Sequence, residues 1–586
     1  MASTLERDSL AGAKWTAVSR ASGFVRTAAI GAALGATWLG NIFQVANQLP
    51  WFLYELLLGS LLASLFVPSL VAARQRSGRE LSRLTGTLVG VVALGFGVLS
   101  LLAAAASPLI ARFVTSGVDV ADQADARRAT IVLLVLTAPQ LAGYALIATL
   151  AAVQNAVGRF AFPAAIPVAE NVLVVAVIGL YWALFPSTRT ELAAFDTSRQ
   201  VLLGLGSSAA VAAHLALSVW VVRRAGIRIR PNLDWHRPEV RRIATVARDS
   251  AGVALLGGVR VLAMLVVAAT VEGGVVVLQF AQAFVNLPIA LVARPIGTAL
   301  IRQLSELLGP SERAGWVREY RSATLLNLAV LIPAAVGLAA FAVAIADAVS
   351  FGALGEGDGT LLLAVSLAAL APSVVGDGGM IVALQAAYSR ADAGTVLRAF
   401  VLRAAGVLIG VAASFSVDGA ARLAVAFLAV GLTDMVSAVA LHQWSVGRWT
   451  PLALRRTLLR VALVASLAIA LPAAVLLLAG DGWTAPPTGI PVVAAAGLVG
   501  LGAYIATERR HDPLRTLSVF GGWETDHVVP VGVLDVDAID PVITAGRRPS
   551  PTVRLAGART IPAVPRPRRR QANSPAPDPA LTGGTR

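Results

Sequence analysis

The apolar positions of the chain are gathered into long runs separated by short polar stretches. The runs cover residues 15–38, 42–72, 84–111, 129–155, 161–185, 200–222, 246–271, 274–301, 322–351, 360–387, 395–416, 420–445, 458–479 and 486–506. Each is long enough for a helix to cross about 30 Å of hydrocarbon. A transmembrane barrel would show alternating segments of about ten residues instead. The pattern predicts an all-α polytopic membrane protein with about fourteen transmembrane helices.

The loops between these runs alternate in charge. One set is rich in arginine: Arg74, Arg76, Arg79, Arg83, Arg159, Arg223, Arg224, Arg228, Arg230, Arg237, Arg241, Arg242, Arg313, Arg318, Arg321, Arg390, Arg398, Arg448, Arg455 and Arg456. The other set is short or acidic: Asp119, Asp122, Asp125, Glu191, Asp196, Glu272, Glu356, Asp358, Asp418 and Asp481. The positive-inside rule places the basic set in the cytoplasm. An even number of spans then places both termini there.

The end of the chain, residues 507–586, has a different composition. It contains few apolar runs and is rich in proline and arginine, as in PRPRRRQANSPAPDPA. Such a composition buries too little apolar surface to fold alone, so we expect a disordered cytoplasmic tail. The alternative is a tail that docks partner proteins or binds anionic lipids. A weak strand-like patch lies at 528–539.

Composition agrees with a membrane protein and excludes several chemistries. The chain is 56% hydrophobic and only 14% charged, and its mean hydropathy is +0.74. It contains no cysteine, which excludes disulfides and thiolate metal sites, and its five histidines form no metal-ligand motif. No phosphate-binding GxxxxGK[ST] loop and no nucleophile–base constellation is present. We therefore expect a transporter rather than an enzyme, with no cofactor. The net charge of +15 is explained by the arginine-rich loops, so no nucleic-acid partner is implied.

We single out four of the arginines that lie inside apolar runs as site candidates: Arg20, Arg26, Arg260 and Arg294. An arginine at the centre of a membrane span costs about 2.5–3.5 kcal/mol or more, so such side chains face a protein interior or a wet cavity. We expect these four to line a cavity that binds an anionic headgroup. The alternatives are that Arg20 and Arg26 snorkel to the cytoplasmic interface, and that Arg260 and Arg294 pair with an acid inside the bundle.

Acids and prolines also lie within the spans. Glu55, Glu170, Asp377 and Asp434 are candidate coupling sites for an ion or a proton, or else neutralise neighbouring arginines. Pro50 and Pro288 interrupt apolar helices, and we expect hinge or cavity roles for both. The alternative for the prolines is a tolerated kink, because proline is frequent in membrane helices.

Several motifs resemble the MurJ (MviN-type) lipid II flippases, within the multidrug/oligosaccharidyl-lipid/polysaccharide exporter superfamily. The opening stretches SRASGFVR, NIFQVANQLPWFL and GSLLASLFVP are similar to the first two helices of that family. The run from Asn155 to Phe160, followed by Pro163, Pro167 and Asn171, is similar to its connection between helices four and five. Tyr388–Asp392 with Thr395 matches its YSR-x-D-x-x-T stretch. The resemblance covers roughly residues 1–506.

The resemblance implies two six-helix lobes related by a pseudo-two-fold axis, followed by two extra C-terminal helices. On this chain the lobes would be 1–223 and 224–445, and the extra helices 446–506. It also implies a place in the bacterial cytoplasmic (inner) membrane and a role in peptidoglycan and cell-wall biogenesis. The expected activity is flipping of undecaprenyl-pyrophosphate-linked precursor, lipid II, by alternating access, with cavity arginines holding the pyrophosphate.

The chain also departs from the family at several charged positions. Many members carry charges where this chain has Asn41, Tyr54, Gln282, Ala283 and Asn286. Two alternative functions follow: a flippase of another polyprenyl-linked glycan or a related exporter, or a transport-inactive paralogue. Such a paralogue would act as a scaffold for cell-wall synthesis proteins through its tail.

Overall fold

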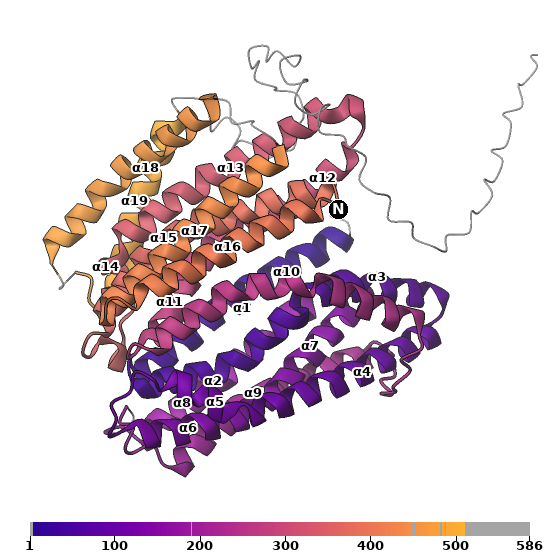
Figure 1. Ribbon diagram of the computed structural model, residues 1–586, viewed down its shortest axis with the longest axis horizontal. Helices are drawn as coiled ribbons and strands as arrows, with labels where there is room; N and C mark the ends of the chain where they lie inside the picture. Colours follow the sequence, from indigo (N-terminus) through magenta and orange to yellow (C-terminus); the bar gives the residue numbers. More distant parts are fainter. Residues whose placement is uncertain (1–3, 189, 447–451, 481–482, 487, 510–586) are drawn as a thin grey trace, which may run out of the picture. The chain divides into compact units, whose positions relative to one another are not determined.

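The computed structural model describes residues 4–509, apart from 189, 447–451, 481–482 and 487. Within these residues the regular structure is helical, with no strand (Figure 1). The all-α prediction is confirmed. The predicted tail beyond Arg509 and its strand-like patch lie outside the described residues.

The first half of the fold contains the helices up to Arg224. Their bounds are α1 (Thr4–Leu34), α2 (Trp38–Tyr54), α3 (Ser60–Arg76), α4 (Gly78–Ala105), α5 (Ser107–Val114), α6 (Gln123–Thr137), α7 (Pro139–Ala156), α8 (Ala161–Leu184) and α9 (Thr197–Arg224), with a π-helical segment η1 (Glu55–Gly59) between α2 and α3. In this half α1 packs along α8, and α7 packs against α3, α4 and α9. Three of the helices begin at side-chain caps, because Thr37, Ser77 and Asp196 accept hydrogen bonds from the first turns of α2, α4 and α9.

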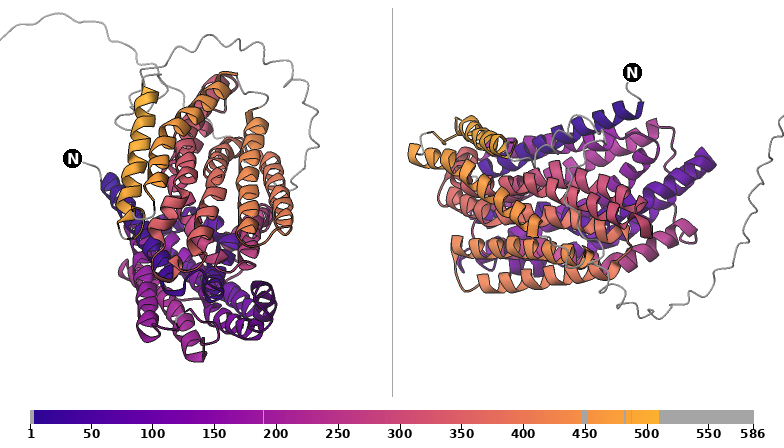
Figure 2. Two further views of the ribbon diagram at one scale, coloured as in Figure 1. Left: turned by 90° about the vertical axis from the view of Figure 1, so that its left-hand side faces the viewer. Right: turned by 90° about the horizontal axis from the view of Figure 1, so that it is seen from above.

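The second half begins at α10 (Pro238–Ala269). It continues through α11 (Gly274–Pro288), the π-helical η2 (Ile289–Ala293), α12 (Arg294–Glu306), the short η3 (Pro310–Glu312), α13 (Arg313–Ala340), α14 (Ala342–Val349), η4 (Gly352–Gly355), α15 (Gly359–Ser389), α16 (Ala393–Ser414) and α17 (Gly419–Val446). Here α15 is central and packs against α11, α12, α13 and α17. Two further helices, α18 (Leu452–Ala479) and α19 (Gly489–Arg509), pack on each other and on α13. Figure 2 shows this pair, in orange and yellow, at the outer side of the second half.

The two halves repeat one arrangement. A 28-residue helix followed by an 8-residue helix occurs as α4–α5 and again as α13–α14. The π-helical segments repeat too: η1 follows α2 and η2 follows α11. At one constant offset, the sequence pairs Gln44 with Gln282, Leu49–Pro50 with Leu287–Pro288, and Gly59 with Gly297. A proline that removes a backbone donor, followed by a wide π turn, breaks each helix near its middle.

One contact region between the halves lies at the end of the helices near Asn41. Asn41 of α2 donates from Nδ2 to the carbonyl of Val271 at 2.7 Å and accepts at Oδ1 from the Val275 N–H at 2.9 Å. Glu272 accepts a hydrogen bond from the Trp38 N–H. Gly273 has φ +71°, and a Cβ there would lie 2.4 Å from Ala36 Cβ. The loops at this end therefore form a close seal, and they belong to the acidic set.

The basic loops gather at the opposite end. Arg237 bonds Glu80 at 2.9 Å, and Arg74 donates to the carbonyl of Ala156 at 3.0 Å. Asn232 hydrogen-bonds the start of α4 through the Gly86 carbonyl and the Thr87 hydroxyl. The alternation of charge along the chain thus corresponds to two ends of the helical unit. Which end faces the cytoplasm stays a prediction from the positive-inside rule.

Twelve helices of the described part are long and apolar enough to cross a membrane. The first two predicted spans, on α1 and on α2–η1–α3, are not among them, so the count of fourteen is not confirmed. The α1 segment is polar for a span because it carries Arg20 and Arg26, whereas 42–72 contains the apolar stretch LLLGSLLASLFV, and the side chains of 58–65 are not among those described. The predicted spans 84–111, 129–155 and 322–351 each consist of two helices joined by a single residue.

The topology can be tested directly because the chain has no cysteine. We expect Arg79→Cys, at the exposed start of α4, to react only with a thiol reagent that enters the cytoplasm. Asp119→Cys, exposed at the other end, should react with an impermeant reagent added outside whole cells. The measurement is labelling of the two single-cysteine proteins in intact and lysed cells. The reverse pattern would contradict the assigned orientation.

Candidate functional site

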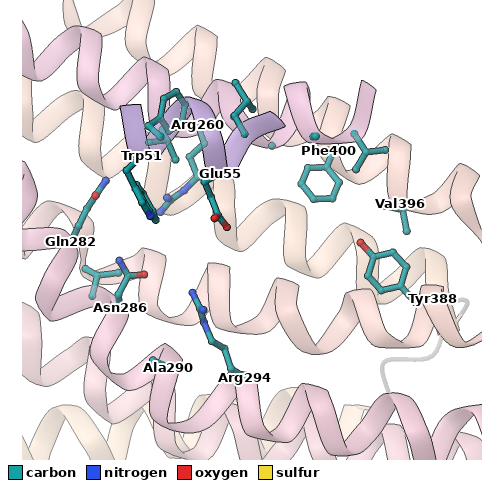
Figure 3. Close-up of a pocket in the computed structure, with 18 of the residues that line it drawn as sticks. Trp51, Glu55, Arg260, Gln282, Asn286, Ala290, Arg294, Tyr388, Val396 and Phe400 are labelled. Atoms are coloured by element: carbon teal, nitrogen blue, oxygen red, sulfur yellow. The ribbon is translucent and has the colours of Figure 1, made fainter. Parts of the chain in front are cut away.

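A cavity of about 1000 Å³ lies between the two halves. The first half contributes α1, α2 and η1, and the second contributes α10, α11, η2, α12, α15 and α16 (Figure 3). Gly258 allows α10 to approach η1, because a Cβ there would lie 2.2 Å from Leu56 Cδ1. The walls include Trp51, Phe52 and Phe400, with polar groups set among them. Apolar walls with a few polar groups are typical of a ligand site.

Three of the four predicted arginines line this cavity: Arg20, Arg260 and Arg294. Arg20 comes from the first half, whereas Arg260 and Arg294 come from the second. Arg20 and Arg294 are exposed, and neither makes a salt bridge to any described residue. Glu55 lines the same cavity and, in Figure 3, points into it from the side opposite Arg294. The structure thus brings two uncommitted guanidinium groups and one carboxylate into one space.

Arg260 is held by a network of ions within the second half. Its Nε lies 2.9 Å from Asp434 Oδ2, and Asp434 is fully buried on α17. Arg403 of α16 binds the same carboxylate through Nε at 2.7 Å and Asp377 of α15 through Nη2 at 2.6 Å. Gly376 permits this approach, since a Cβ there would lie 2.6 Å from the Asp434 backbone. Two arginines and two aspartates therefore join four helices in a neutral cluster.

Arg26 lies outside the cavity lining, in a second network inside the first half. Its Nη1 is 3.4 Å from Glu170 Oε1 and 3.3 Å from Asn171 Oδ1 of α8. Glu170 also accepts the Tyr144 hydroxyl at 3.0 Å, and its Oε2 lies 2.6 Å from His214 Nδ1. The sequence analysis gave two alternatives for the intramembrane acids: a coupling site, or a partner that neutralises an arginine. Glu170, Asp377 and Asp434 each contact an arginine, as the second alternative requires.

The uncharged residues that stand where many family members carry a charge lie partly in the seal and partly in the cavity. Asn41 lies in the seal and uses both its donor and its acceptor there, which a carboxylate could not do. Gln282 and Asn286 line the cavity, whereas Tyr54 and Ala283 are not in its lining. Pro50 and Pro288 are also absent from the lining and lie just before η1 and η2. Their predicted role as hinges stays a prediction.

Sequence reasoning missed three residues of these sites and gave no role to Asp392, which it named only as part of the YSR-x-D-x-x-T stretch. Arg403 lies in the apolar stretch VLRAAGVLIG, so the signal used for Arg20 applied to it equally. His214 and Tyr144 stand alone on apolar helices, and nothing in the sequence pairs them with Glu170. Asp392 caps α16 at the mouth of the cavity. Burial raises the pKa of its carboxyl, but hydrogen bonds from the Thr395 hydroxyl and N–H outweigh this and hold the pKa below its usual value.

These features define a class: a polytopic helical membrane protein of two repeated halves with a cationic cavity between them. The family profile described as "Lipid II flippase MurJ" matches residues 30–486. The chain therefore belongs to the MurJ family.

The curated relatives agree with this assignment. The chain is 26% identical over 330 residues to a "Probable lipid II flippase MurJ" of Rhizobium tropici, covering 55% of this chain and 58% of that protein. It is 30% identical over 302 residues to the protein of that name in Rhizobium meliloti (strain 1021), covering 50% of this chain and 53% of the relative. The chain thus aligns with little more than half the length of each.

Solved structures show the same fold. A structure described as "Lipid II flippase MurJ, inward closed conformation" has a TM-score of 0.67 at 16% identity, covering 86% of this chain and 99% of that one. An inward-facing multidrug resistance MATE family transporter of the MOP superfamily has a TM-score of 0.56 at 14% identity, covering 74% of this chain and 95% of that one.

The buried network around Asp434 should dominate the stability of the second half. We expect Asp434→Asn to lower the free energy of unfolding by about 3–5 kcal/mol, because it leaves Arg260 and Arg403 short of a buried counter-ion. Asp418→Asn, beside the same helix, removes an exposed partner of Arg422 and should cost about 1 kcal/mol or less. Denaturant unfolding in detergent micelles measures both. Equal losses in the two variants would contradict this account of the cluster.

Proposed function

We propose that this protein binds the phosphate-bearing headgroup of a polyprenyl-linked saccharide in its cavity and moves it across the membrane. One observation carries the proposal: Arg20 from one half and Arg294 from the other line a single cavity and have no salt-bridge partner among the described residues. A guanidinium stays charged at all physiological pH values and binds phosphate through two parallel hydrogen bonds. An anion held between these arginines would link the halves electrostatically.

The substrate we propose is lipid II, the substrate in the names of the relatives. Its pyrophosphate would lie between Arg20 and Arg294, with Arg260 at the edge of the same cavity. The polyprenyl chain would remain in the lipid, next to the apolar exterior of the helices. On α18, Leu459, Leu463, Leu467 and Leu471 form an i, i+4 stripe that is 60–72% exposed, as expected of a lipid-facing surface.

The mechanism we propose is alternating access. The cavity reaches the loop between α15 and α16, which carries Arg390 and belongs to the basic set. With that set in the cytoplasm, the cavity opens inward and the seal around Asn41 faces outward. Movement of the lobes 1–223 and 224–445 would reverse this, with the π-helical breaks after Pro50 and Pro288 as hinges. Helices 446–506 and the tail 507–586 lie outside this movement.

The intramembrane acids have different roles in this proposal. Glu170, Asp377 and Asp434 act as fixed counter-ions, since each already contacts an arginine. Arg26 acts indirectly, by holding α1 against α8 through Glu170 and Asn171. Glu55 is the remaining acid of the predicted set, and it alone of the four lines the cavity.

A second candidate is a flippase of another polyprenyl-linked glycan. Gln282 and Asn286 present neutral amides inside the cavity, at positions where many family members are charged. Amides donate and accept hydrogen bonds and suit sugar hydroxyl or acetamido groups. Competition between lipid II and other polyprenyl-pyrophosphate saccharides for the purified protein separates the two candidates.

Arg20→Ala and Arg294→Ala should each reduce flipping by about tenfold to a hundredfold, the equivalent of one lost charge-assisted hydrogen-bonding group. Arg294→Lys should recover only part of the activity, because an ammonium keeps the charge but loses the planar fork. The measurement is flipping of lipid II in proteoliposomes at matched protein levels.

The matched control is Arg302→Ala on α12, an exposed residue that pairs with Glu306 and is absent from the cavity lining. It should flip at the wild-type rate. Undiminished flipping by both Arg20→Ala and Arg294→Ala would refute the role of these arginines. Absence of flipping by the wild type itself would favour a transport-inactive scaffold.

A further inference from the structure

The cavity lining carries more positive than negative side chains. Five charged side chains line it: Arg20, Glu55, Arg260, Arg294 and Asp392. Arg260 is bound to Asp434, and Asp392 caps α16 through Thr395. Arg20, Arg294 and Glu55 make no salt bridge or side-chain hydrogen bond to any other described residue. These three groups are thus the adjustable charges of the site, and together they sum to +1.

Glu55 is placed to meet the arginines. It is the first residue of η1, is exposed to the cavity, and interacts electrostatically with Arg294 across the space between the halves. Figure 3 shows the Glu55 carboxylate and the Arg294 guanidinium pointing into the cavity from opposite sides. Arg20 and Arg294 line the same cavity and carry like charges. Glu55 shares this cavity with both arginines.

An alternating-access cycle has a step that makes this carboxylate necessary. After the headgroup leaves, the cavity must close around no substrate before it opens on the other side. Closure removes water, and two guanidinium groups left in an apolar space without an anion are costly. Any net charge that moves through the transmembrane potential while the empty protein returns adds a further electrostatic cost.

We propose that Glu55 is the internal counter-anion of the empty transporter. It neutralises Arg20 and Arg294 when the cavity holds no substrate, and a phosphate-bearing headgroup displaces it when substrate enters. This inference rests on the proposed function. Glu55 is then a positioning residue rather than a coupling site, and it lets the empty cavity close.

Removing the carboxylate should therefore shift binding and turnover in opposite directions. In Glu55→Gln the headgroup no longer competes with a fixed anion, so affinity for inorganic pyrophosphate should rise by about tenfold, as expected for the loss of one like charge in the same cavity. Return of the empty protein should slow, so the maximal rate of lipid II flipping should fall by about fivefold or more. Glu55→Asp keeps the charge and should resemble the wild type in affinity.

The experiment uses the full-length protein. Pyrophosphate affinity is measured by titration calorimetry in detergent at low ionic strength, and flipping of lipid II is measured in proteoliposomes over a range of substrate concentrations. The matched control is Glu306→Gln on α12, which removes the same charge from an exposed side chain outside the cavity. It should leave both quantities unchanged.

The outcomes separate this inference from the proposed function. If the wild type binds pyrophosphate and flips lipid II, but Glu55→Gln shows unchanged affinity or loses affinity and rate together, the inference is overturned and the proposed function stands. If the wild type neither binds pyrophosphate nor flips lipid II, the proposed function is overturned and the inference with it. The inference is supported only if Glu55→Gln binds pyrophosphate more tightly and flips lipid II at a lower maximal rate, while Glu306→Gln changes neither.

Discussion

A guanidinium inside a membrane cannot discard its charge, so each one needs an anion or water. This constraint organises the interior of the protein. Arg26 contacts Glu170, and Arg260 and Arg403 share Asp434 and Asp377. These clusters lie within single halves and hold their helices together. Arg20 and Arg294 differ, because they line the space between the halves and have no such partner in the described part of the chain. Because these two groups are exposed to the cavity and are not bound to a carboxylate, we propose that the cavity is a site for an anion.

The repeat explains how the site arises from the fold. Each half breaks one helix with a Leu-Pro step and a π turn, at Pro50–η1 and at Pro288–η2. Glu55 opens the first π turn, and Arg294 follows the second. One structural element, used twice, thus delivers a carboxylate from one half and a guanidinium from the other. Within the seal, the Asn41 side chain joins the halves through two neutral hydrogen bonds, which can break and re-form at lower cost than buried ion pairs.

Much of the fold could be predicted from the sequence, because membrane helices follow from the length of apolar runs. The family resemblance also agreed with the profile match. Several features could not be predicted. The first predicted span, on α1, does not qualify by hydropathy, because it carries Arg20 and Arg26. An arginine within a span shows that it needs a partner but not which one, so Arg26–Glu170 and Arg260–Asp434 required the packing of helices distant in sequence. Arg403 carried the same signal as Arg20 and was overlooked.

The central claim is that one anionic headgroup contacts an arginine from each half. A structure of the full-length protein with bound lipid II, determined by cryo-electron microscopy in a lipid nanodisc, tests this most directly. The account predicts pyrophosphate oxygens within hydrogen-bonding range, about 2.7–2.9 Å, of both Arg20 and Arg294. It also predicts that the Glu55 carboxylate has moved away from them. A headgroup bound outside the cavity, or one that contacts residues of a single half only, would contradict the account.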